Sequence, residues 1–227
     1  MGTAFVDKIR RELADAGDAE RAVQQQRYMK SRLPFYGVPM PAVRQIVRSA
    51  LGAHPIADQR DLTTTVLALW DGAGHREDWY AALAVLQAPR HRAWRDLTLL
   101  PQYDHLVVTG HWWDVVDDVA THALGELLAL EPERVGALMR QWAVDDDLWR
   151  RRAALVCQVG AKDDTDVALL EDVVLVNLDD ADFFVRKGIG WALRAYAHTD
   201  PEWVRAFVDA HRVRMSPLSL REAPKHQ

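Results

Sequence analysis

This chain of 227 residues has little cysteine and none of the common metal-binding motifs. Cys157 stands alone, which excludes an internal disulfide and favours a reducing compartment. We expect this thiol to be buried and inert. The sequence has neither a CxxC pair nor an HExxH motif, and its nine histidines are dispersed. We therefore expect no metal and no other cofactor.

Signals of several other function classes are also missing. There is no GxxxxGK[ST] or GxGxxG loop to hold phosphates, and no GxSxG turn to present a nucleophilic serine. No apolar run approaches the length that spans a bilayer, and the charged, amphipathic N-terminus lacks the core of a signal peptide. These absences predict a cytoplasmic protein without a membrane partner.

The formal net charge of −5 is unfavourable for a protein that binds nucleic acid, but the charge is unevenly distributed. Residues 21–60 carry +6 and residues 183–227 carry +4, whereas residues 61–182 carry −13. Such a chain can present a basic face if its two ends line one groove. A solvated surface of mixed charge is the alternative.

Apolar residues recur at spacings of three and four along most of the chain, and no stretch alternates with period two. This pattern predicts on the order of a dozen short helices joined by tight turns. Asp61 is a candidate N-cap of one helix, and Thr199 or Asp200 of another. The helices pair at roughly 35–45 residues, which is typical of helical-repeat proteins.

The expected fold is therefore all-α, a curved α-solenoid of degenerate HEAT-like helical repeats. An irregular helical bundle is the alternative. We expect residues 1–227 to form a single HEAT-like repeat domain. The segment SPLSLREAPKHQ, residues 216–227, is predicted to be a flexible tail.

Two tryptophans and several acids lie together in HWWDVVD at residues 111–117. Trp113 and Asp117 are four residues apart, so they share one face of a helix. An indole beside a carboxylate suits the stabilisation of positive charge. The alternative is that one of the paired tryptophans fills the core, while the acids only favour the start of a helix.

Basic residues cluster in three further segments. The consecutive arginines 150–152 point in different directions on a helix, so at least one of them turns inward or toward a groove. Lys187, Trp191 and Arg194 form one stripe, which suits contact with a polyanion better than burial in a core. Tyr28 begins a segment of basic and aromatic residues. Ordinary exposed helix faces are the alternative for each cluster.

These segments, in this order, resemble the AlkD-like DNA alkylation-repair family of HEAT-like DNA glycosylases. The matching pieces are YMKSRLPFYGV (28–38), HWWDVVD (111–117), DLWRRRAAL (147–155) and DFFVRKGIGWALRAYAHTDPEWV (182–204). The resemblance implies a monofunctional glycosylase of base excision repair, a hydrolase that removes cationic N3- and N7-alkylated purines from duplex DNA. 3-Methyladenine and 7-methylguanine are such bases. A monomer that associates with double-stranded DNA in a bacterial-type nucleoid is expected.

The resemblance also implies roles for single residues. The family's catalytic aspartate corresponds to Asp117, and its two active-site tryptophans correspond to Trp113 and Trp191. The residues that the resemblance places at the DNA groove are Arg152, Tyr28, Lys187 and Arg194.

Two features depart from the family pattern, and two other functions stay open. Arg150 stands where an apolar residue is expected, and the middle of the chain is strongly acidic. The chain can instead be a non-catalytic helical-repeat module that binds DNA or protein, or a self-resistance glycosylase for bulky alkyl adducts. A module that only binds DNA has no need of a carboxylate directed at its ligand, because a carboxylate repels phosphate.

Overall fold

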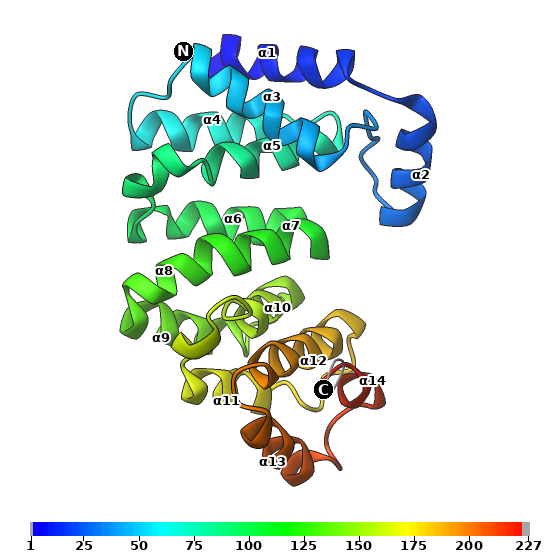
Figure 1. Ribbon diagram of the computed structural model, residues 1–227, viewed down its shortest axis with the longest axis vertical. Helices are drawn as coiled ribbons and strands as arrows, with labels where there is room; N and C mark the ends of the chain where they lie inside the picture. The colour runs from blue at the N-terminus through cyan, green and yellow to red at the C-terminus, as the bar shows by residue number, and fades with distance from the viewer. Residues whose placement is uncertain (1, 224–227) are drawn as a thin grey trace. The chain divides into compact units, whose positions relative to one another are not determined.

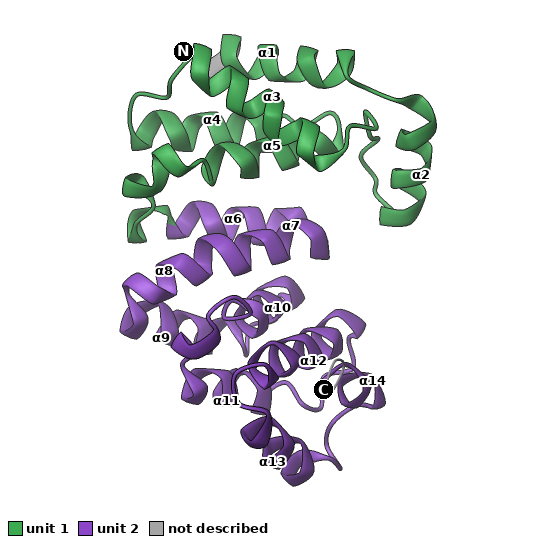
Figure 2. Ribbon diagram, viewed as in Figure 1, with its two compact units in different colours: residues 1–99 green, residues 100–227 purple. Residues whose placement is uncertain are grey.

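The computed structural model describes residues 2–223, and every regular element in that range is a helix (Figure 1). The prediction of an all-α chain is confirmed. The chain divides into two compact units, residues 1–99 and residues 100–227 (Figure 2). The grouping of residues 1–227 into one HEAT-like domain stays a prediction. Within residues 2–223, no helix combines the length and the apolar composition that crossing a membrane requires.

Unit 1 is a stack of helices around a small apolar core. Its elements are α1 (Gly2–Asp15), α2 (Ala19–Met29), α3 (Met40–Ala53), α4 (Gln59–Asp71), α5 (Arg76–Leu86) and the 3₁₀ helices η1 (Pro89–Trp94) and η2 (Leu97–Leu99). Helices α1 and α5 each pack against both α3 and α4. The N-cap of α4 is Asp58, whose side chain accepts the backbone N–H of Asp61, so the predicted cap at Asp61 is wrong by one turn.

A fully buried carboxylate fixes the loop between α2 and α3. Glu77 on α5 accepts hydrogen bonds from the backbone N–H groups of Tyr36, Gly37 and Val38, at 2.8–3.0 Å. Three backbone donors satisfy a charge that would otherwise be costly to bury. Gly37 has a φ of 86°, and a Cβ there would overlap the carbonyl oxygen of Asp18. Because Gly37 also accepts a hydrogen bond from Arg21 at 2.8 Å, this loop links the start of α2, the helix that carries Tyr28, to α5.

Unit 2 is also built from stacked helices. Its elements are α6 (Leu100–Gly110), α7 (Trp113–Asp118), the π-helical segment η3 (Val119–Leu124), α8 (Gly125–Leu130), α9 (Pro132–Trp142), α10 (Leu148–Val156), the 3₁₀ helix η4 (Lys162–Asp164), α11 (Val167–Leu175), α12 (Phe183–Ala197), α13 (Pro201–His211) and α14 (Pro217–Glu222). Helix α10 lies at the centre of this unit, where it packs against α6, α7, α9, α11 and α12.

Three helices of unit 2 follow a repeat of 35 residues. The N-caps of α7, α10 and α12 are Trp112, Asp147 and Asp182, at a constant separation. In helical repeats, a constant separation brings equivalent positions of successive helices side by side. The fifth residue after each cap is Asp117, Arg152 or Lys187. The repeat therefore puts an acid and two bases at equivalent positions of these three helices.

The end of the chain differs from the predicted flexible tail. Residues 217–222 form α14, whose N-cap Ser216 accepts the backbone N–H of Ser219, and α14 packs on α12. The hydroxyl of Ser219 donates to the carbonyl oxygen of Arg186 at 2.9 Å, and Glu222 is buried. The prediction is wrong for this segment because tertiary packing orders a helix too short to form alone. Residues 224–227 of the predicted tail lie outside the described part of the chain.

Gly190 makes the close packing of α14 on α12 possible. A Cβ at position 190 would overlap the Cβ of Glu222 and would lie 3.2 Å from the carbonyl oxygen of Ser219. Gly190→Ala should therefore lower the free energy of unfolding by about 1–3 kcal/mol, because α14 must move away. Gly52→Ala is the matched control, since a Cβ there meets nothing within 4 Å.

The control should stabilise the protein by about 0.5–1 kcal/mol, because alanine favours a helix over glycine. Urea unfolding of both variants measures the difference. Equal stabilisation of the two would mean that α14 does not pack on α12 in solution.

Candidate active site

Asp117 forms a buried ion pair with Arg152. The Nε of Arg152 donates to Oδ1 of Asp117, and Nη2 donates to Oδ2, both at 2.7 Å. The two side chains are 13% and 6% exposed, respectively. A planar guanidinium matches both carboxylate oxygens at once, so the pair fixes the position and the orientation of the carboxylate.

Arg152 also ties α7 and α10 to α12. Its Nη1 donates to the carbonyl oxygen of Phe184 at 2.6 Å, in the first turn of α12. On the next turn of α12, a Cβ at Gly188 would lie 3.6 Å from Nη1 of Arg152, in ordinary contact. Position 188 of α12 therefore faces the guanidinium of Arg152. Arg152 is thus turned toward protein groups, and this differs from the expected contact with DNA.

Burial raises the pKa of Asp117 above the ordinary value for aspartate. Arg152 opposes this shift through its hydrogen bonds and its charge, whereas the nearby carboxylates of Asp114 and Asp118 add to it. The carboxylate is therefore held in a poorly hydrated place by a single cation. A charge fixed in such a place acts strongly on charge that develops next to it.

The two adjacent tryptophans have different environments. Trp112 lies edge-on to Phe184, with ring centroids 5.2 Å apart, and it also contacts Trp149. Trp113 is half-buried on α7, one turn before Asp117, and among the described residues its ring stacks on no other aromatic ring. One tryptophan of the pair thus belongs to an aromatic cluster, and the other is half-buried outside that cluster.

Helix α12 contributes Trp191 and Lys187. Trp191 is half-buried, and it follows Gly188 by three residues, so it lies on the side of α12 that faces Arg152. Lys187 is exposed, and within residues 2–223 its ammonium group has no polar partner. In the 35-residue repeat, Lys187 occupies the position equivalent to those of Asp117 and Arg152.

The other two predicted DNA contacts are placed differently. The Nη1 of Arg194 donates to Oε2 of Glu222 at 3.1 Å, so a carboxylate of α14 partly neutralises its charge. Tyr28 is 75% exposed on α2, in unit 1. Of the seven predicted site residues, six lie on the three helices joined by Arg152, and these six are Trp113, Asp117, Arg152, Lys187, Trp191 and Arg194.

The two arginines before Arg152 serve the framework of unit 2. Arg150 donates to both carboxylate oxygens of Asp104 on α6, at 2.8 Å each, and also pairs with Asp145 at 3.2 Å. Arg151 pairs with Asp180 at 3.1 Å and donates to the carbonyl oxygen of Asp145. Arg150, which departs from the family pattern, thus has its own acidic partners.

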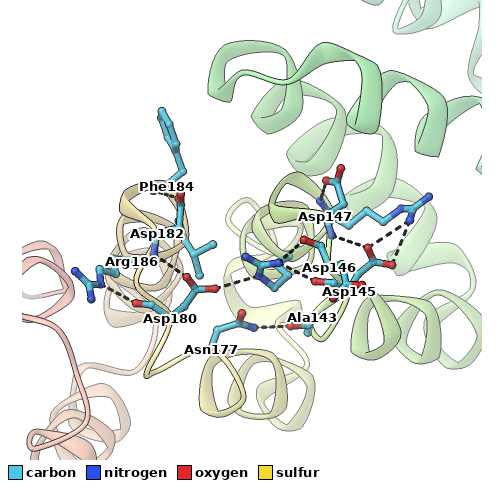
Figure 3. Close-up of polar contacts among 12 residues, drawn as sticks. Ala143, Asp145, Asp146, Asp147, Asn177, Asp180, Asp182, Phe184 and Arg186 are labelled. Carbon is cyan, nitrogen blue, oxygen red and sulfur yellow. Dashed lines mark hydrogen bonds and ion pairs between the residues drawn. The ribbon is translucent and has the colours of Figure 1, made fainter.

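The loops before α10 and α12 share one construction (Figure 3). The backbone N–H of Asp147 donates to Asp145 at 2.8 Å, and that of Asp182 donates to Asp180 at 2.7 Å. Each second aspartate then caps its helix. Arg186 donates to the carbonyl oxygen of Asp180, which repeats the contact of Arg151 with Asp145. Equivalent N-caps therefore fix where α10 and α12 begin, and Arg152 and Lys187 each follow their cap by five residues.

A π-helical segment follows Asp117 and Asp118 directly. The hydroxyl of Thr121 donates to the carbonyl oxygen of Asp117 at 2.7 Å. Such segments are often found at functional sites. On the far side, a Cβ at Gly125 would lie 2.6 Å from the carbonyl oxygen of Cys157, so α8 closely approaches the end of α10.

The structure also bears on the expectations about Cys157 and about metal binding. Cys157 is buried, as predicted, and burial raises the pKa of its thiol to about 12, so it is protonated and a poor nucleophile. Within residues 2–223, no group of three His, Cys, Asp or Glu side chains is placed to hold a metal ion.

Sequence reasoning missed three residues that shape this site. Phe184 accepts the third hydrogen bond of Arg152, and Phe184, Trp149 and Trp112 form the aromatic cluster beside the ion pair. A signal was present in the 35-residue separation, because Trp112, Asp147 and Asp182 are equivalent N-caps and Trp149 and Phe184 follow the last two by two residues.

Comparison with known proteins adds independent findings. Residues 9–227 match a family described as "DNA alkylation repair enzyme". A solved structure described as "Predicted DNA alkylation repair enzyme from Enterococcus faecalis" is similar, with a TM-score of 0.83 and 26% sequence identity. The similarity covers 92% of this chain and 96% of that one. No curated protein matches the chain by sequence.

Proposed function

Because this chain belongs to the family of DNA alkylation repair enzymes, we propose that it is a glycosylase that removes cationic N3- and N7-alkylated purines from duplex DNA. The observation that carries the proposal is the Asp117 carboxylate. Arg152 holds it with two hydrogen bonds of 2.7 Å at a buried place, one helical turn after the half-buried Trp113.

The chemistry needs few groups, because the leaving base is already positively charged. Its departure requires no general acid, so the barrier lies in the positive charge that builds up on the deoxyribose as the N-glycosidic bond stretches. The electron pair of that bond passes to the base, which leaves as a neutral molecule. Neutral lesions lack this advantage and should be poor substrates.

Asp117 stabilises the developing oxocarbenium character and orients the attacking water. The water oxygen bonds to C1′ of the sugar, and the proton that it loses passes to the carboxylate and then to solvent. Trp113 and Trp191 present indole faces, which attract a cation and exclude water. This work requires an ionised carboxylate, and Arg152 favours that form.

The basic residues divide into two roles. Arg152 is a positioning residue, because its guanidinium lies against Asp117 and the backbone of Phe184. Lys187 and Tyr28 are exposed, and we assign them to contacts with the DNA backbone. Arg194 is paired with Glu222, which neutralises part of its charge. Its contribution to DNA binding should therefore be smaller than that of Lys187.

Incubation with DNA methylated by N-methyl-N-nitrosourea tests the proposal. Wild-type protein should release 7-methylguanine and 3-methyladenine, measured by chromatography of the free bases against a reaction without protein. A second substrate, DNA that carries a bulkier N3- or N7-adduct, covers the alternative lesion range. Release of the bulkier base alone would keep the chemistry and change the lesion range to that of a self-resistance enzyme. Tight binding of DNA with no release of any of these bases would contradict catalysis and favour a binding module.

A further inference from the structure

Unit 1 carries an open groove that is separate in sequence from the Asp117 site. The groove has a volume of about 490 Å³ and lies between α3 and the end of α5. Val47, Leu51 and Ala84 contribute apolar side chains to it. The basic side chains that line it are those of Arg44, Arg48 and Arg90, and no acidic residue lines it.

Two of these arginines are free to bind a ligand. Arg44 and Arg48 are exposed on successive turns of α3, and within the described part of the chain neither guanidinium has a polar partner. Like charges at this spacing repel each other. An anion that bound between them would remove the repulsion and would occupy their unused donors.

Arg90 differs from the other two because it is partly fixed. Its Nη1 donates to the carbonyl oxygen of Leu51 at 2.7 Å, near the end of α3. This bond joins the turn after α5 to α3, and among the described residues the other donors of this guanidinium have no hydrogen-bond partner. The groove thus has one anchored cation and two exposed cations without a polar partner in the described part of the chain, around an apolar floor.

We propose that this groove is a second DNA contact, which binds the sugar–phosphate backbone of the duplex. The proposal rests on the proposed function, which makes DNA the polyanion that this chain meets. The three guanidinium groups can donate hydrogen bonds to phosphate oxygens, and the apolar floor can pack against the deoxyribose between successive phosphates. This groove also gives a role to the +6 charge of residues 21–60 in a chain whose net charge is −5.

The test compares two double variants that remove the same charge from unit 1. Arg44→Gln/Arg48→Gln removes two of the three cations that line the groove. Arg11→Gln/Arg60→Gln is the matched control, because both of these arginines are exposed on other helices and do not line the groove. Affinity for an undamaged duplex is measured by fluorescence anisotropy across a salt titration, and thermal unfolding checks that each variant is folded.

The groove variant should bind the duplex about tenfold more weakly at low salt, and the slope of log K against log salt should fall by about 2. The control should stay near wild type. Equal losses in both variants would overturn the proposal, since net charge alone would then explain them. Polyglutamate of matched charge that binds the groove at least as tightly as DNA would also overturn it, in favour of an acidic protein partner.

The two proposals fail in different ways. A wild-type protein that releases methylated bases, and whose affinity is indifferent to Arg44 and Arg48, retains the proposed function and loses the groove. A protein that releases no base, but whose affinity for DNA depends on these arginines, retains the groove and loses the glycosylase activity.

Discussion

Replacing Asp117 with asparagine should lower the release of 7-methylguanine by about 10²–10⁴-fold under single-turnover conditions. The amide has nearly the same shape, but it carries no charge to stabilise the oxocarbenium character of the sugar. Affinity for undamaged duplex should be unchanged or higher, because a carboxylate next to DNA repels phosphate. The variant thus separates chemistry from binding.

Asp114→Asn is the matched control on α7. It removes one negative charge from the same short helix but leaves the pair of Asp117 and Arg152 intact. Release by this control should stay near the wild-type rate. Full activity in Asp117→Asn would show that another acid performs the chemistry, and a loss in both variants would point to the stability of α7 rather than to one carboxylate.

Much of the fold was predictable because helix signals are local. The periodicity of apolar residues gave an all-α chain, and Asp200 caps α13, as its place before Pro201 predicted. Cys157 is buried, as was expected for a free cysteine. Such inferences need only a few neighbouring residues, and for that reason they are reliable without any knowledge of tertiary contacts.

The partner of each arginine was not predictable from local sequence. Arg150, Arg151 and Arg152 are neighbours, yet each has a carboxylate partner far along the chain, at 46, 29 and 35 residues, respectively. Which acid each one meets depends on how the helices stack. The inward turn of one arginine was expected from the 100° step of a helix, but its contact with Asp117 needed the 35-residue repeat.

The helix α14 shows a second limit of sequence reasoning. Six residues are too few to form a stable helix alone, so SPLSLREAPKHQ gave no convincing local signal. Its order comes from the space above Gly190 and from the contacts of Ser219 and Glu222 with α12. A prediction from sequence would have to know that Gly190 faces the end of the chain.

Replacing Arg152 with alanine should have the largest effect on stability. It leaves the Asp117 carboxylate buried without its cation, and breaking a buried pair in this way costs about 3–5 kcal/mol. Urea unfolding measures this loss. Arg150→Ala is the matched control, since Arg150 also binds a carboxylate with two hydrogen bonds but is 29% exposed, and it should cost about 1 kcal/mol or less.

The dependence of base release on pH distinguishes positioning from simple stability. The carboxylate works only when ionised, so the rate falls as the pH drops through the pKa of Asp117. Arg152 lowers that pKa, so its removal should raise it further and move the acidic limb of the rate profile to higher pH. Release by Arg152→Ala should therefore recover in part as the pH rises, whereas Arg150→Ala should leave the limb in place.

A double variant separates the pair's role in folding from its role in chemistry. Asp117→Leu/Arg152→Met replaces a buried ion pair with apolar groups, and such replacements are often neutral or stabilising. Its free energy of unfolding should recover toward that of the wild type, while base release stays absent at every pH. Arg152→Lys keeps the cation without the planar fork, and it should retain more activity than the alanine variant. If the limb stays in place in both the alanine and lysine variants, Arg152 has no influence on the ionisation of Asp117, and its contact with the carboxylate is structural only.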